Sequence, residues 1–294
     1  MKKTYGFLLG VFLLFLLFAC KNRNITDNQT FDDQQAGDQI EEYDNIFYRF
    51  PSPDEMLNII DRESIDFDDA LPLNSEYANR YLDSRSQALN LGVYSADLAY
   101  ITLMKRQKEV LSYFQVVYGL SEKLRISSAF EPTLMKRFEN NIGNFDTLKI
   151  LTDEAIVDIN NYLSRNDKER IFVMISIGGF IESLYLAFNL VGDYSEGNSI
   201  IIQRISDQKL VLENLLGFAA DYADDSNVSA CIELINPVRA VYNELLVKQE
   251  ETTVTKDVNG KLIIGGGEKI KITPDQFNKL REAIFDVRKS ITEN

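Results

Sequence analysis

The chain has 294 residues, of which 45% are hydrophobic and 11% aromatic, a composition that excludes an intrinsically disordered protein. Its formal net charge is -14 and no run of lysines and arginines concentrates positive charge, which argues against a nucleic-acid partner. Histidine is absent, which removes the histidine-dependent triads and dyads and nearly all zinc and iron sites, so we expect no metal and no cofactor.

The first twenty residues have the layout of an export signal. Lys2 and Lys3 precede an apolar run from Phe7 to Ala19, which is too short to span about 30 Å of hydrocarbon as a mature helix. The segment Leu17-Phe18-Ala19-Cys20 resembles the lipobox of bacterial lipoproteins, where a signal peptidase cuts before the cysteine and its thiol carries diacylglycerol.

This resemblance covers only that segment, and it implies a signal peptide over residues 1–19, lipidation of Cys20 and a membrane anchor. Lys21 follows the cysteine, whereas an Asp there would resemble the inner-membrane retention signal of some bacteria. We therefore expect a lipid-anchored protein of the cell envelope, held at the outer membrane.

The segment that follows the cysteine is strongly acidic. Residues 21–69 contain fourteen Asp and Glu against four Lys and Arg, and the part up to about Asn45 has few apolar residues and no periodicity. Such a segment cannot bury enough apolar surface to offset its ordering entropy. We predict a lipidated, flexible acidic tether over residues 20–50 and a single helical domain over residues 51–294.

Helical patterns occupy the first half of that domain. Capping signals and apolar positions three or four apart predict a short helix after Ser52, further helices, and a break between the second and third helix at Gly92. After that short helix, four more are predicted, over Ser75–Leu89, Tyr94–Leu124, Pro132–Asn140 and Thr152–Ser164.

The segment Ile171–Val191 is long and apolar enough to cross a membrane. Glu182 lies at its middle, and Gly178 and Gly179 would let other helices approach closely. These features favour a buried central helix, which we expect to end at Gly192.

Two more helices are expected, over Ser199–Tyr222 and Val228–Lys248, the second interrupted at Asn236-Pro237. Alternating residues around Asn259-Gly260 predict a hairpin over about 252–264, followed by a flexible Gly265–Gly267 run. A capping box at Thr273 opens a C-terminal helix over about 274–292. The fold prediction is an all-α multi-helix bundle of about seven to nine helices with a small β-hairpin near the C-terminus.

Two carboxylates, Asp97 and Glu182, lie in apolar helical segments, where the pKa of a carboxyl group is raised unless the group is paired. They could form a ligand site with Tyr94, Tyr100 and Tyr185 as its walls. They could equally form a structural ion pair, or Asp97 could stabilise the first turn of its helix.

The cysteines support no intrachain disulfide, because lipidation of Cys20 leaves Cys231 alone in an apolar stretch as a buried thiol. With no nucleophile motif, we assign no catalytic residue and expect no enzyme. The leading hypothesis is an interaction or scaffold module with an envelope protein as its partner and an exposed apolar patch. The alternatives are a glycan- or peptide-binding lipoprotein with a tyrosine-lined pocket, and a hydrolase with paired carboxylates in a cleft.

Overall fold

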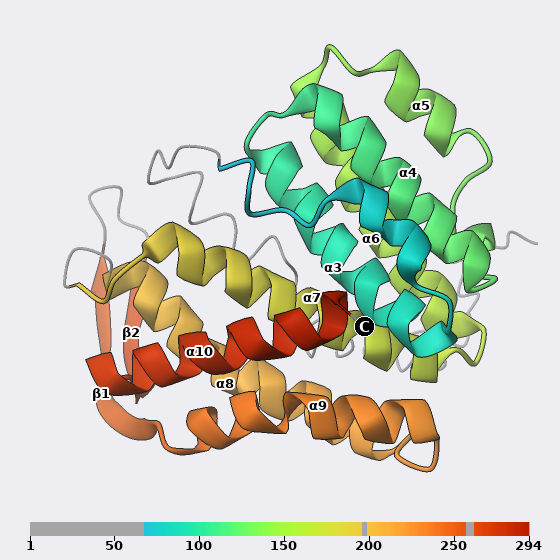
Figure 1. Cartoon of the computed structure of the whole chain (residues 1–294). Coiled ribbons are helices and arrows are strands. Elements are labelled where there is room, and N and C mark those ends of the chain that lie inside the picture. The colour runs from blue at the N-terminus through green and yellow to red at the C-terminus, as the bar shows by residue number, and fades with distance from the viewer. Residues whose placement is uncertain (1–67, 196–198, 257–261, 294) are drawn as a thin grey trace, which may run out of the picture. The chain divides into compact units, whose positions relative to one another are not determined.

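The computed structural model describes residues 68–195, 199–256 and 262–293, and these form helices with one two-stranded antiparallel sheet near the C-terminus (Figure 1). The all-α bundle with a small hairpin is thereby confirmed. The elements are η1 (Ser75–Arg80), α3 (Ser84–Leu103), α4 (Gln107–Lys123), η2 (Ser127–Ala129), α5 (Leu134–Asn140), α6 (Phe145–Arg165), α7 (Glu169–Val191), α8 (Ser199–Ala220), α9 (Ser226–Asn243), β1 (Leu246–Lys256), β2 (Leu262–Lys271) and α10 (Pro274–Thr292).

The helices are arranged around the pair α3 and α7, which share the largest interface between helices in this part of the chain. On one side of the pair lie α4, α5 and α6 with the two short 3-10 helices. On the other side α8, α9 and α10 pack on α7, and β2 packs on α8 (Figure 1). The C-terminal end of α10 returns to α3, where Asn90 Nδ2 donates to the Ile291 carbonyl.

Helices α3 and α7 approach closely because glycines face each other across the interface. A Cβ atom on Gly92 would collide with the Ile175 carbonyl oxygen, and one on Gly178 would collide with the Leu89 carbonyl oxygen. The prediction that Gly92 separates two helices was therefore wrong. Gly92 lies inside α3, where its missing side chain lets the two backbones touch.

Helix boundaries between residues 75 and 124 also differ from the prediction. The expected helix after Ser75 is only the 3-10 turn η1, and α3 begins where the Asp83 side chain accepts hydrogen bonds from the backbone of Arg85 and Ser86. The expected long helix breaks at Lys105, whose φ of 57° ends α3 before α4 begins. Neither boundary is marked by glycine or proline, the usual signals.

Helix α7 is the one described helix that is long and apolar enough to cross a membrane, and 78% of its most apolar window is buried inside the protein. As predicted, it lies in the core and ends at Gly192, whose φ is 67°. Helix α6 extends the predicted helix at its start, because Asn144 accepts a hydrogen bond from the Thr147 backbone. At Pro237 we expected a kink or a restart, and helix α9 is continuous through this residue, which excludes the restart.

The hairpin is longer than predicted, since β1 pairs with β2 from Leu246 opposite Lys271 to Lys256 opposite Leu262. The Gly265–Gly267 run belongs to β2 and lies beside a register shift in β1, where we had expected a flexible link. The predicted turn at Asn259-Gly260, the helix after Ser52, Cys20 and the tether lie outside the described residues. The capping box at Thr273 is present and opens α10 as predicted.

Candidate functional site

Three ionisable side chains from three helices meet in the core: Asp97 of α3, Glu182 of α7 and Arg288 of α10. Asp97 and Glu182 are completely buried, and Arg288 is 14% exposed. Arg288 Nε donates to Glu182 Oε2 at 2.7 Å and Nη2 donates to Oε1 at 2.9 Å. This is the bidentate geometry that gives the strongest charge-assisted hydrogen bonds. We call these three residues the Asp97 cluster.

Two carboxyl groups share one guanidinium in this cluster, so only one of them is matched by a positive charge. Burial raises the pKa of Asp97 well above its ordinary value, the charge of Glu182 raises it further, and Arg288 opposes both. Asp97 and Glu182 are hydrogen-bonded to each other, and this bond raises the pKa of Asp97 and lowers that of Glu182. The proton therefore resides on Asp97.

The remaining hydrogen bonds of Asp97 agree with that assignment. Its Oδ2 accepts from the Leu73 backbone N–H at 2.9 Å, while its Oδ1 is buried and receives no donor from the described residues. A neutral carboxyl oxygen that carries the proton is a donor and needs an acceptor, which Glu182 provides. Burial also raises the pKa of Glu182, against which Arg288 acts. Burial lowers the pKa of Arg288, but the charge and hydrogen bonds of Glu182, with smaller contributions from Asp97 and Tyr185, raise it overall, so Arg288 keeps its charge.

The cluster holds a short irregular segment, Leu71–Asn74, which connects the start of the described chain to η1. Asp97 binds its Leu73 N–H, and Arg288 Nη2 donates to the Leu71 carbonyl at 3.3 Å. Tyr113 donates to the Leu73 carbonyl at 2.9 Å. Buried backbone groups outside helices and sheets require partners. The cluster and Tyr113 therefore supply hydrogen bonds that this non-helical segment cannot make within itself.

The predicted tyrosines also surround this segment. Tyr94 donates to the Asn74 carbonyl at 2.9 Å, and Tyr100 accepts from the Asp68 N–H at 3.2 Å. The Tyr185 ring lies under Arg288, with 3.8 Å between the guanidinium carbon and the ring centroid. Burial raises the pKa of all three tyrosines, so each remains a neutral phenol. The structure thus brings the five proposed residues together around residues 68–74.

Sequence reasoning missed Arg288 and Tyr113, although the sequence contains a signal for the first. Arg288 lies four residues after Ile284 and three before Ile291, so it falls on the buried apolar stripe of α10. A charged residue on such a stripe needs a buried partner. Asp97, expected in the first turn of a helix, is instead in the second half of α3, so a helix-end role is ruled out.

The geometry of the Asp97 cluster differs from that of a carboxylate-dependent hydrolase. Such enzymes hold their two carboxyl groups about 5 to 9.5 Å apart with the scissile bond between them. Here the carboxyl groups of Asp97 and Glu182 hydrogen-bond directly to each other, and both side chains are fully buried. Neither lines the two described surface pockets. The arrangement hydrogen-bonds the backbone of the segment Leu71–Asn74 and keeps one proton on Asp97.

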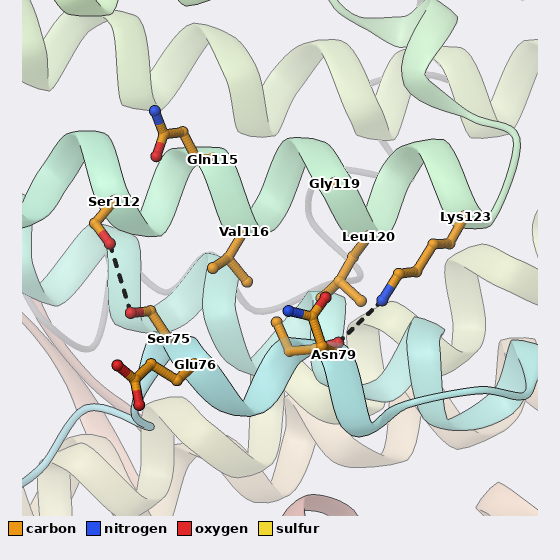
Figure 2. A pocket seen from close by; sticks show the side chains of 10 residues that line it. Ser75, Glu76, Asn79, Ser112, Gln115, Val116, Gly119, Leu120 and Lys123 are labelled. Atoms are coloured by element: carbon orange, nitrogen blue, oxygen red, sulfur yellow. Dashed lines mark hydrogen bonds between the residues drawn. The ribbon is translucent and has the colours of Figure 1, made fainter.

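The two described pockets lie elsewhere. One of about 340 Å³ runs between η1 and α4 (Figure 2), and the other, of about 430 Å³, is bordered by α8, β2 and Tyr194. Tyr194 is the one tyrosine that lines either of them, whereas the ligand-binding hypothesis expected several. Within the described ranges, no group of three or more Cys, Asp or Glu side chains is placed to hold a metal ion. No family model, curated protein or solved structure matches the chain.

Proposed function

We propose that the protein is a lipid-anchored interaction module of the bacterial cell envelope that binds a partner protein through the outer face of α6. The anchor rests on the lipobox-like segment that ends at Cys20. The observation that carries the binding face is a pair of apolar side chains left uncovered on α6. Ile150 is 56% exposed and Val157 is 42% exposed.

Ile150 and Val157 are seven residues apart, which places them two turns apart on the same face of the helix. Between them on this face lie Asp153 and Glu154, and Asp146 lies one turn before Ile150. Asp153 is paired with Lys149 and Glu154 with Arg137, so the two apolar side chains are bordered by charges that are already paired. The complement of this face is a partner protein that presents apolar side chains within a polar rim.

Site-specific photo-crosslinking in intact cells tests the binding face. We expect a crosslinker at Ile150 or Val157 to capture one discrete partner, and a crosslinker at Glu282 on the exposed side of α10 to capture none. Replacing Ile150 and Val157 by Glu should abolish capture through a crosslinker at the neighbouring Asp146. Equal capture at Ile150 and Glu282, or capture that survives the double substitution, would refute the α6 face.

The anchor is tested separately by the Cys20→Ala variant. We expect this variant to lose labelling by radioactive palmitate and to accumulate with its signal peptide attached. If it is processed and membrane-bound like the unmodified protein, the lipoprotein assignment fails while the binding face on α6 remains open to the crosslinking test.

A further inference from the structure

The groove between η1 and α4 is a second surface feature, independent of the α6 face (Figure 2). Its volume of about 340 Å³ lies in the range of small-ligand sites. At one end the hydroxyl groups of Ser112 and Ser75 are 3.5 Å apart, and at the other Lys123 Nζ donates to the Ala78 carbonyl at 3.1 Å. The α4 side is about 16 Å long from Ser112 to Lys123, the length of roughly four or five extended residues.

Gly119 keeps the middle of this groove open. A Cβ atom on Gly119 would meet nothing within 4 Å, whereas a Cβ on Gly92 or Gly178 would collide with a neighbouring helix. Glycine inside a helix costs about 0.5 to 1 kcal/mol relative to alanine. Packing within the described chain does not account for Gly119, but its bare backbone lets another chain approach α4 closely. Gly217 of α8 has equal space around it and lines neither described pocket.

The walls of the groove suit an extended peptide better than a helix. Val116 and Leu120 provide a small apolar floor, and Asn79, Ser75 and Ser112 add amide and hydroxyl groups. Those groups hydrogen-bond to N–H and C=O groups, which an extended chain leaves unpaired and a helix has already paired. A docked helix would require a wider apolar groove with anchors on one face.

The two charged residues of the groove distinguish its ends. Lys123, at one end, has three ammonium protons, of which one is used by Ala78. Glu76 lies next to Ser75 at the other end, and its carboxylate forms no ion pair with the residues described here. A ligand with a carboxylate at one end and an amino group at the other would match this polarity.

We infer that the groove binds a short peptide of about four or five residues in an extended conformation, its C-terminal carboxylate at Lys123 and its amino group at Glu76. The peptide backbone passes over Gly119 and hydrogen-bonds to Asn79. This site is a ligand-binding function in addition to the partner surface on α6. The proposal for the groove does not depend on whether the α6 face binds a partner.

Isothermal titration calorimetry of the full lipidated protein in detergent tests this site, with penta-alanine as the probe. We expect saturable binding of the peptide with free termini, and at least about tenfold weaker binding of the C-terminally amidated peptide. The Lys123→Gln variant should bind both forms equally. No saturable heat at roughly 10 mM peptide, or an unchanged preference in Lys123→Gln, overturns the inference.

A matched pair of glycine variants separates ligand contact from folding. Gly119→Leu should abolish penta-alanine binding, because its side chain fills the groove, and it should not lower the melting temperature, because leucine favours a helix. Gly217→Leu makes the same change on α8 and should bind like the unmodified protein. If Gly119→Leu binds normally, or if Gly217→Leu loses binding to the same extent, the groove is not the site.

Discussion

Asp97 and Glu182 hydrogen-bond to each other in the interior, although they belong to different helices and both are fully buried. Arg288 neutralises one of the two negative charges, and a proton on Asp97 neutralises the other. The fold therefore contains a proton that the unfolded chain releases at neutral pH, where an ordinary Asp is ionised. The stability of the protein must then depend on pH through this residue.

Asp97→Asn should remove that pH dependence. The pKa of Asp97 is raised in the folded state, so its stabilising contribution is full below the unfolded value of about 3.9 and is lost as pH rises through the folded pKa. In that window the free energy of unfolding falls by up to about 1.4 kcal/mol per pH unit. Asparagine keeps both hydrogen bonds, accepting from Leu73 and donating to Glu182. Urea denaturation from pH 4 to 8 should show a flatter curve for the variant.

Asp83→Asn is the control, because Asp83 caps the start of α3, the helix that carries Asp97, but its pKa is shifted in the opposite direction. Backbone hydrogen bonds at the start of α3 lower the pKa of Asp83. Its contribution is present above the unfolded pKa and is lost as pH falls through the folded value, so Asp83→Asn should lessen the loss of stability at acidic pH. Parallel stability curves for Asp97→Asn and the unmodified protein would show that Asp97 is ionised in the fold.

Arg288→Met should be among the most destabilising single changes in the protein. It leaves Glu182 buried with no cation and removes a donor from the Leu71 carbonyl. Loss of one partner of a buried ion pair costs about 3 to 5 kcal/mol. Chemical denaturation should show this loss, and the double variant Arg288→Met, Glu182→Met should regain most of it.

Lys279→Met provides the comparison on the same helix. Lys279 pairs with Asp275 at 2.9 Å, but both side chains are largely exposed to solvent. Its removal should leave the denaturation midpoint unchanged. If Arg288→Met also leaves the denaturation midpoint unchanged, the bidentate contact with Glu182 does not contribute to the stability of the fold.

The elements that the sequence predicted well are those with local signals. The capping box at Thr273, the apolar stripe of α10 and Gly192 at the end of α7 each act within one helical turn, and the structure has all three. Gly92 was misread because a glycine inside a helix gives the same local signal as a break. Only Ile175 and Gly179, which come from a distant segment, decide that it is a packing contact.

The site could be predicted only in part, for a similar reason. Burial of Asp97 and Glu182 follows from the apolar residues around each in sequence, and both are buried. Their contact depends on how α3 crosses α7, and the role of Arg288 depends on α10 returning to both. The segment Leu71–Asn74, which uses the cluster, has no helical or strand pattern that would reveal the burial of residues 71–73.

Cys231 should be unreactive in the folded protein. It is fully buried in α9, and burial raises its pKa to about 12, so little thiolate exists at neutral pH. A disulfide reagent such as Ellman's reagent should detect no thiol before denaturation. After denaturation it should detect one thiol if Cys20 is acylated, whereas detection of two would contradict lipidation.

Gly178→Ala should test the close approach of α3 and α7. The added methyl group would collide with the Leu89 carbonyl oxygen, which is part of a helix backbone and cannot rotate away. Overpacking of this kind costs about 1 to 3 kcal/mol, more than the gain from replacing a helical glycine. Gly119→Ala is the matched change at a glycine with open space, and it should stabilise the protein by about 0.5 to 1 kcal/mol. Thermal denaturation should therefore move in opposite directions for the two variants, and a stabilised Gly178→Ala would mean that the helices do not touch there.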